Sequence, residues 1–409
     1  MAILAGTDRL SGHVRKLCPS TTVRHRGARR VAFAAIVACL VCGRTSAIDS
    51  ARAEDRVVVK TETYTDSDHT TVVRPVVGVA KDLGKWFVLD AAYSVDAITT
   101  ASIDVVTHAT TPEFTDRREE ANAKVTFRGG SGLALGGSVS YSTEADYESR
   151  AVSFQASRDL FDRNTTLNVD VGHVHDTVRH VTDNVFSEPL EGLGYAFGIA
   201  QVVSRRLVVR GGYEGASFDG FQQSPYRAVR FGPYKFTLQN GVPRFDGVTA
   251  TRRERHPDTR LRHSVFVGAA WHFGRCYSLQ PKVQVYSDDW GVASQTAEIA
   301  WLVEPREGLV LRAHYRFYRQ TAADFWEMQY VSAPESYPFY SADKRLGRLN
   351  GHLAGVRAEY MFAGPRPGSP FARIGVDAKV DVSRNEYLDY LFLDDRQALV
   401  VQLGLFTEM

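Results

Sequence analysis

Apolar and charged residues alternate at single-residue intervals along the last third of the chain. In the segment 309–317, one set of alternate positions is apolar, and the intervening set includes Arg312, His314 and Arg316. In the segment 371–382, the even-numbered positions are small or apolar, and most odd-numbered positions are charged. Because successive side chains of a strand point to opposite sides, each segment predicts a β-strand with one apolar wall and one polar wall.

The same alternation recurs from residue 86 to the C-terminus and predicts about fourteen strands. Connections after even-numbered strands are short and rich in turn formers, such as 129–132, whereas several connections after odd-numbered strands are long, such as 216–259. Short turns at one end and long loops at the other are typical of outer-membrane β-barrels. A hairpin near 234–241 would raise the strand count to about sixteen, and one false strand pair would lower it to about twelve. The expected strands are 86–97, 117–128, 133–142, 149–158, 165–175, 192–203, 207–215, 260–273, 277–287, 295–303, 309–319, 349–362, 371–383 and 397–408.

Aromatic residues collect at the ends of the expected strands. Tyr93, Tyr141 and Phe317 lie toward the rim at which the long loops occur. A larger set lies at the opposite ends: Trp86, Phe127, Phe161, Phe273, Tyr277, Phe362, Phe371 and Phe406. Two aromatic girdles are typical of the two membrane–water interfaces of a transmembrane barrel. The fold class expected is therefore all-β, a closed antiparallel transmembrane β-barrel formed by residues 86–409.

The N-terminal segment 1–53 has the features of a secretory leader. Four arginines between 24 and 30 precede an apolar run at 31–43, and small residues follow at Ala47 and Ala53, two alternative cleavage sites. The apolar run is too short to span a bilayer as a helix, which needs roughly 20 residues. Cys39 gives a third alternative, a lipoprotein cleavage box. The polar segment 54–85 is interpreted as a periplasmic N-terminal segment or a plug of the lumen.

Composition narrows the class of protein further. The chain has 49 basic and 47 acidic residues and a formal net charge of +2, which argues against a nucleic-acid binder. After removal of the leader only Cys276 remains, so the mature chain cannot form an intramolecular disulfide. No cofactor or metal is expected. No nucleophile elbow, metalloprotease motif or phosphate-binding loop occurs in the sequence, so an enzyme is not expected.

The inward faces of the expected strands carry interleaved charges of both signs. Two alternatives follow: a constricted polar channel, or a salt-bridged, water-filled interior that maintains the shape of the barrel and conducts little. In contrast, Gly194 and Gly198 leave the inward face of the strand 192–203 almost bare. The candidates for the lumen or its constriction are Glu298, Arg312, His314, Arg316, Arg357, Glu359, Arg373, Asp377 and Lys379.

Three other features each have a functional and a structural interpretation. His173 and His175 share one strand face and would chelate a metal if a third ligand, such as Asp176 or His180, joined them. The expected register instead places both rings on the outer wall. The arginine-rich loop 216–259 is either a surface that touches lipopolysaccharide phosphates or a lid that captures a ligand. His272 faces inward, but no serine partner for it is identifiable.

Several short motifs resemble an uncharacterised proteobacterial family of outer-membrane barrels, catalogued as a domain of unknown function, number 3570. The similar segments are 93–102, 117–119, 224–227, 256–260 and 355–360, and the resemblance covers about residues 86–409. It implies a barrel fold and an outer-membrane address, and it implies no substrate. The chain departs from outer-membrane barrels in ending with Met409 instead of Phe or Trp. This difference implies weaker recognition by the barrel assembly machinery.

The sequence therefore predicts an outer-membrane β-barrel of a Gram-negative bacterium that acts as a channel or transport pore for small polar solutes. The alternative is a non-conducting barrel that serves as a structural, docking or surface-interaction module. The expected partners are outer-membrane lipid, lipopolysaccharide and the barrel assembly machinery, with no nucleic acid. Nothing in the residue pattern specifies an oligomeric state.

Overall fold

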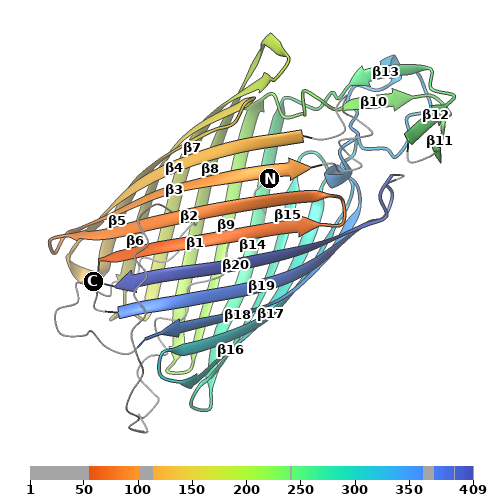
Figure 1. Cartoon of the computed structure of the whole chain (residues 1–409). Helices are drawn as coiled ribbons and strands as arrows, with labels where there is room; N and C mark the ends of the chain where they lie inside the picture. Colours follow the sequence, from red (N-terminus) through yellow and green to blue (C-terminus); the bar gives the residue numbers. More distant parts are fainter. Residues whose placement is uncertain (1–54, 101–113, 240–241, 363–372, 391, 409) are drawn as a thin grey trace, which may run out of the picture.

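The computed structural model of the chain describes residues 55–100, 114–239, 242–362, 373–390 and 392–408. Within them, sixteen antiparallel strands close into one barrel in sequence order, with β1 beside β20 (Figure 1). We call the end of the barrel with the short connections the turn end, and the opposite end the loop end. The predicted leader, residues 1–53, lies outside the described residues. No helix in the described part of the chain is long and apolar enough to cross a bilayer.

The strands range from eleven residues, as in β1, to 22 residues in β8. Their bounds are β1 Arg56–Asp66, β2 Thr70–Leu83, β3 Phe87–Thr100, β4 Phe114–Arg128, β5 Leu133–Thr143, β6 Tyr147–Leu160, β7 Thr165–His180, β8 Asp183–Ser204, β9 Leu207–Gly220, β14 Thr259–Phe273, β15 Tyr277–Asp288, β16 Ala293–Arg306, β17 Leu309–Gln320, β18 Leu349–Met361, β19 Arg373–Tyr387 and β20 Asp395–Glu408. The fourteen predicted strands all correspond to strands of the barrel.

The prediction for residues 54–85 was wrong. Instead of a periplasmic segment or a plug, the chain there forms the hairpin β1–β2, which is part of the barrel wall and raises the strand count from fourteen to sixteen. The outward face of β1 begins with Val57 and Val59 but continues with three threonines, so its apolar signal is weak. Threonine is nevertheless a good strand former, because its β-branched side chain packs well on a pleated surface.

The alternation of side chains has the predicted orientation in every strand that carries a lumen candidate. On the outer wall, Val356 and Leu403 are 59% and 61% exposed, and on the inner wall Arg312 and Asp377 are 8% and 3% exposed. The outer wall between the two ends is predominantly apolar, with exposed Val267, Ile299 and many similar residues. Such a surface is suited to lipid, whereas the inner wall is suited to water.

Aromatic side chains form a belt around the turn end. Trp86 stacks on Phe127 with ring centroids 6.2 Å apart, and Phe273 stacks on Tyr277 at 5.9 Å. One member of the predicted girdle differs: Phe406 lies at this end but faces inward and is buried, because its position is out of phase with the apolar residues of β20. Phe371 lies outside the described residues.

A folded cap lies beyond the loop end of the barrel. It consists of the described residues of the two longest connections, 221–239 with 242–258, and 321–348. The first connection forms the pairs β10 Ala228–Phe231 with β13 Ala250–Arg253, and β11 Lys235–Gln239 with β12 Val242–Asp246 (Figure 1). The hairpin predicted near 234–241 therefore exists, but it belongs to the cap and not to the barrel. Short 3-10 turns occur at Gly130–Gly132, Pro334–Ser336 and Lys344–Leu346.

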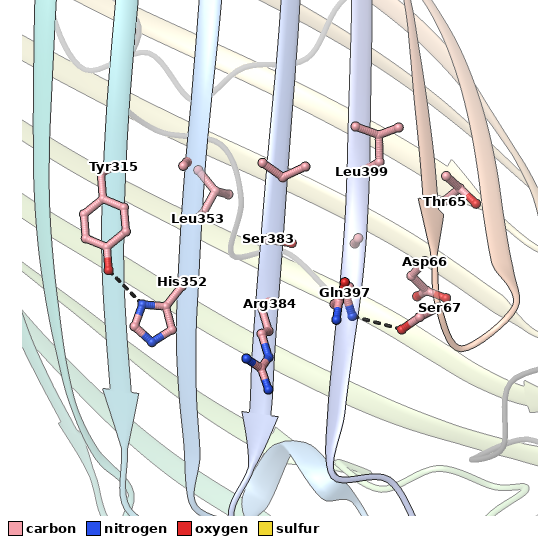
Figure 2. A pocket seen from close by; sticks show the side chains of 13 residues that line it. Thr65, Asp66, Ser67, Tyr315, His352, Leu353, Ser383, Arg384, Gln397 and Leu399 are labelled. Carbon is pink, nitrogen blue, oxygen red and sulfur yellow. Dashed lines mark hydrogen bonds between the residues drawn. The ribbon is translucent and has the colours of Figure 1, made fainter.

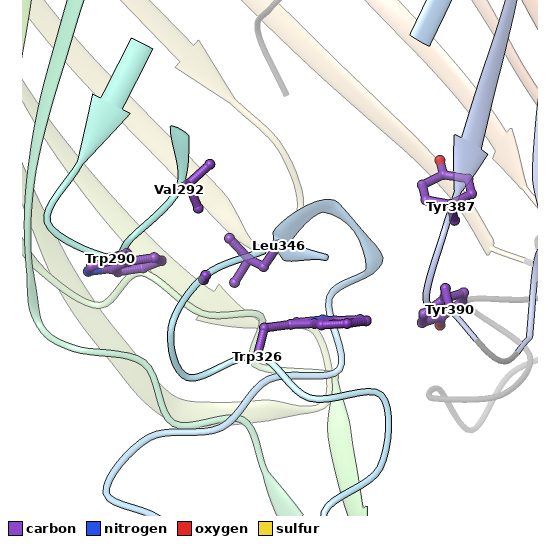
Figure 3. Close-up of a cluster of buried hydrophobic side chains, with 7 residues drawn as sticks. Trp290, Val292, Trp326, Leu346, Tyr387 and Tyr390 are labelled. Atoms are coloured by element: carbon purple, nitrogen blue, oxygen red, sulfur yellow. The ribbon is translucent and has the colours of Figure 1, made fainter. Parts of the chain in front are cut away.

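Two aromatic clusters form the core of the loop end. In the cap, Phe231 and Tyr330 pack at 5.5 Å, and the adjacent backbones form a parallel bridge between the two long connections. Nearer the barrel, Trp290 and Trp326 lie in a second cluster with Leu346 and Tyr390 (Figure 3). Burial of aromatic side chains is a major stabilising contribution in any fold. The long connections are thus packed structures rather than extended loops.

The seam between β1 and β20 generates a testable prediction. Thr63 is the cross-strand partner of Val401, and Val401 is the partner of Val380 on β19. In a Cys276→Ser background, the pair Thr63→Cys and Val401→Cys should form a disulfide on oxidation and shift the mobility of the denatured protein on a gel. The pair Thr63→Cys and Val380→Cys should not, because positions two strands apart are roughly 10 Å apart, beyond the reach of a disulfide. Absence of the first cross-link would contradict the closed barrel.

Candidate functional site

Two facing sectors of the inner wall differ in the size of their side chains. The charged sector, β16 to β19, carries all nine lumen candidates, and in the small-residue sector, β5, β6 and β8, most inward positions are glycine, alanine or serine. In the closed strand order β17 lies eight strands from β5, so the two sectors lie on opposite sides of the lumen. Short side chains leave more of the lumen cross-section free on their side. Gly194, Ala196, Gly198 and Ala200 of β8 belong to the small-residue sector.

Three cations of the charged sector form a cross-strand row, which we call the paired row. Arg312 on β17 lies opposite Arg357 on β18, and Arg357 lies opposite Lys379 on β19. Like charges directly opposite one another are destabilising unless they are compensated. Each cation therefore has its own carboxylate: Arg312 Nη2 with Glu298 Oε1 at 3.3 Å, Arg357 Nε with Asp377 Oδ2 at 2.6 Å, and Lys379 Nζ with Asp381 Oδ2 at 2.7 Å.

Asp377 links four strands around the paired row. Its side chain is almost fully buried, and besides Arg357 it accepts a hydrogen bond from Gln402 Nε2 on β20 at 2.8 Å. Lys60 Nζ on β1 lies 3.9 Å from its Oδ1 atom. The sequence interpretation missed Lys60 because it treated residues 54–85 as a separate segment. The alternation of Lys60 and Glu62 with Val59 and Thr61 is the signal that identifies it.

The structure places the remaining candidates as follows. His314 Nε2 lies 3.4 Å from Asp381 Oδ1, and Glu359 pairs with Arg357 at 3.4 Å. Arg316 lies opposite Glu298 in the register, but no carboxylate of the described residues is within ion-pair distance of it. Arg373 is 47% exposed at the turn end, where it lies 3.8 Å from Glu408, away from the other candidates.

The two histidines of β7 lie on the outer wall, as the register predicted. His173 Nε2 and His175 Nδ1 approach the two oxygens of the same carboxylate, Glu191, at 3.1 and 2.5 Å. Asp176 does not join them, because it faces the lumen and accepts a hydrogen bond from the Tyr147 hydroxyl. Across the described residues, no group of three such side chains has a geometry that would hold a metal ion.

His272 faces the lumen near the turn end, opposite Ser278 on β15. Neither ring nitrogen of His272 has a hydrogen-bond partner among the described residues. A serine becomes a nucleophile when a base within hydrogen-bond distance takes its proton. The described geometry therefore gives Ser278 no such base.

Two arginines of the cap have their partners within the cap. Arg227 Nη1 lies 3.1 Å from Asp343 and 3.6 Å from the buried Glu254, and the Arg230 guanidinium lies 3.8 Å above the ring of Phe245. Although burial opposes ionisation, Arg227 and Arg345 hold the pKa of Asp343 well below its usual value. The arginines that remain exposed on the first connection are Arg244, Arg252, Arg253 and Arg255.

Contacts fix the cap to the other described connections at the loop end. Lys344 Nζ forms a buried ion pair with Asp68, in the β1–β2 turn, at 3.0 Å. The Tyr226 hydroxyl accepts a hydrogen bond from the Val181 amide, between β7 and β8, at 3.0 Å. Phe392, between β19 and β20, packs on Phe236 at 4.8 Å. The cap thus connects turns that are far apart in the sequence.

A shallow groove of about 570 Å³ lies on the outer wall near the loop end, across β17 to β20 and β1 (Figure 2). Its apolar side is formed by Ala354, Val382 and Leu399. Its polar side includes His352, which is hydrogen-bonded to Tyr315 at 2.7 Å, and Arg384. The change from apolar to polar within one groove is what an interface between lipid tails and head groups favours.

These features define the class of protein: a closed sixteen-stranded antiparallel barrel with an apolar exterior, a charged interior and a folded cap. The model of the family described as "Protein of unknown function (DUF3570)" matches residues 104–192 and 187–368. These matches span more than half of the chain, which therefore belongs to this family, as the resemblance predicted. No curated protein sequence matches the chain.

Solved structures share the barrel at low similarity. CdiB from Acinetobacter baumannii is 11% identical with a TM-score of 0.47, and the match covers 86% of this chain and 60% of that one. A bacterial polysaccharide outer membrane secretin is 9% identical with a TM-score of 0.46, covering 88% and 100%. The Pseudomonas putida toluene transporter TodX is 9% identical with a TM-score of 0.40, covering 88% and 90%. Similarity this low carries no argument about function.

The paired row generates a second prediction. Arg357→Ala leaves the buried Asp377 without its nearest cation, and loss of one partner of a buried ion pair typically costs about 3–5 kcal/mol, less where lumen water screens the charge. The melting temperature, followed by heat-dependent gel mobility in detergent, should fall markedly. Arg373→Ala is the control, because an exposed pair contributes only about 0–1 kcal/mol. Equal, small effects of both changes would contradict the assigned role of Asp377.

Proposed function

We propose that this protein is an outer-membrane pore for small polar solutes. Three features support the proposal: a closed barrel of sixteen strands, a polar interior and a predominantly apolar outer wall. Barrels of 16–18 strands enclose an aqueous channel, whereas barrels of about eight strands are filled by their own side chains. A charged inner wall is stable only where water or a partner solvates it.

The observation that carries the proposal is the unequal division of the inner wall. Long charged side chains line the charged sector, and glycine, alanine and serine line most of the facing small-residue sector. A Cβ atom added at Gly194 would meet only the Gly172 carbonyl oxygen, at 3.9 Å, which is ordinary contact. Open space beside a charged wall is the arrangement that a conducting lumen requires.

The orientation follows from the two ends of the barrel. Outer-membrane barrels have short turns on the periplasmic side and longer loops outside the cell, so we assign the turn end to the periplasm. The cap then faces the cell exterior, and the exposed arginines of its first connection are suited to contact lipopolysaccharide phosphates. The proposal includes insertion of this barrel into the outer membrane by the barrel assembly machinery.

One observation favours a second function, a surface-docking barrel that conducts little. The cap has its own aromatic core and buried ion pairs, so it is a preformed surface rather than a set of mobile loops. A preformed surface is suited to binding a partner without a large entropic penalty. Conductance separates the two functions.

The pore predicts discrete conductance steps when the refolded barrel is added to a planar bilayer. Gly194→Phe should lower the step size, because the ring enters the lumen beside the small-residue sector, while the melting temperature changes little. Leu193→Phe is the matched control, since its side chain lies on the outer wall and should leave the step size unchanged. A folded barrel without conductance would exclude the pore and favour the docking function.

The orientation predicts which cysteines react in intact cells. Cys276 lies in the β14–β15 connection at the turn end, whereas Val185 is 92% exposed at the loop end. A membrane-impermeant thiol reagent should label Val185→Cys in a Cys276→Ser background on intact cells. It should label Cys276 of the unmodified protein only after the outer membrane is breached. The reverse pattern would invert the assigned orientation.

A further inference from the structure

A second cross-strand row runs beside the paired row on the inner wall. Through the register it joins Arg210 on β9, Gly268 on β14, Lys282 on β15, Glu298 on β16 and Arg316 on β17. All five positions are in phase with the inward faces of their strands. We call Arg210, Lys282 and Arg316 the open cations, because no carboxylate of the described residues lies within 4 Å of any of them, in contrast to the paired row.

The neighbourhood of the open cations has a positive excess. Lys282 interacts electrostatically with Arg210, Arg316, Glu214 and Glu298, and Arg210 with Glu298 and Arg312. This group contains four cations and two carboxylates, an excess of two positive charges. Moreover, Glu298 is already paired with Arg312 at 3.3 Å. Arg312, which lies outside this second row, therefore compensates most of the charge of Glu298.

Local packing keeps the open cations directed toward the lumen. Gly268 has no side chain between Arg210 and Lys282, and a Cβ atom placed there would lie 3.6 Å from Arg210 Nε and 3.6 Å from Lys282 Cβ. The Lys282 ammonium lies 4.8 Å above the ring of Phe266, an arrangement that stabilises a cation without neutralising it. The result is a basic patch on the inner wall with a glycine between two of its cations.

We propose that the open cations form a binding site for small oxyanions, such as phosphate, sulfate or carboxylate solutes, within the lumen. This proposal rests on the proposed pore, in which the site would be a step on the path of the solute. Guanidinium groups bind oxyanions through paired hydrogen bonds, and the ammonium of a lysine adds a point charge. The paired row offers no such site, because its cations already bind carboxylates of the chain.

The position of the site is compatible with passage of the solute. Conduction requires binding that is strong enough to admit a solute and weak enough to release it. Glu298 and Glu214 lower the net positive potential near the open cations, and the glycine and alanine face of β8, which pairs with β9, leaves room for hydrating water. We therefore expect anion selectivity with saturable binding rather than tight capture.

The test compares the unmodified barrel with the triple variant Arg210→Gln, Lys282→Gln and Arg316→Gln. A matched control, Lys85→Gln, Arg205→Gln and Arg206→Gln, removes the same charge from exposed connections at the turn end. In a potassium chloride gradient, the reversal potential should show anion preference in the unmodified and control barrels and lose it in the triple variant. Inorganic phosphate should reduce the chloride current, with an apparent affinity at least about tenfold weaker in the triple variant.

A second measurement separates failure of the site from failure of the pore. At equal ionic strength, phosphate should raise the melting temperature of the barrel in detergent relative to chloride, and this rise should disappear in the triple variant. A phosphate-dependent rise without any conductance would retain the anion site and overturn the pore. Conductance with unchanged selectivity and phosphate response in the folded triple variant would overturn the anion site alone.

Folding of the variants is checked by heat-dependent gel mobility. If the triple variant does not fold, Lys282→Gln and Arg316→Gln are measured separately. Each should weaken the phosphate effect on current and on melting temperature relative to the control. If neither single change alters these effects, the site is overturned.

Discussion

The hydrogen-bonded seam between β1 and β20 is the contact on which the rest of the structure depends. It runs from Arg56 opposite Glu408 to Asp66 opposite Ala398, and it removes both free edges of the sheet. In lipid, an open edge would leave backbone groups without partners at a cost of several kcal/mol each. On the inner wall Lys60 approaches Asp377 across the seam, and at the loop end the Ser67 amide donates to the Gln397 carbonyl oxygen. Backbone and side chains thus close the barrel together, and closure creates the separate interior and exterior.

Once an interior exists, its cations fall into two groups. The paired row compensates three adjacent cations with carboxylates from neighbouring positions, so these ions stabilise the wall on which they lie. A buried charge without a partner is unfavourable, and it persists only where water or a ligand solvates it. In the proposed pore, lumen water and passing anions would solvate the open cations. The proposal thus assigns a structural use to the cations of one row and a functional use to those of the other.

The cap gives the loop end a defined shape. Its two connections pair with each other through backbone bridges and pack around Phe231 and Tyr330. Lys344 and Asp68 tie this unit to the first hairpin, so the cap depends on the closed seam below it. Burying an ion pair is favourable only when its geometry is good and its remaining hydrogen bonds are satisfied. In the proposed pore and orientation, a solute from outside the cell would therefore meet a fixed entrance and not a set of mobile loops.

The sequence by itself determined the strands from 86 onward and the wall on which each side chain lies, because an alternation of period two is a local property. It therefore placed Arg312, Arg357 and Asp377 inward together. Only the tertiary structure decided their partners, because the pairing of Arg357 with Asp377 depends on the register between strands. The tertiary structure also decided that β1–β2 belongs to the wall, since threonines weaken its local signal and β20, more than 300 residues away, supplies its partner. Local sequence patterns likewise could not predict the folded cap, because its core joins residues of two separate connections.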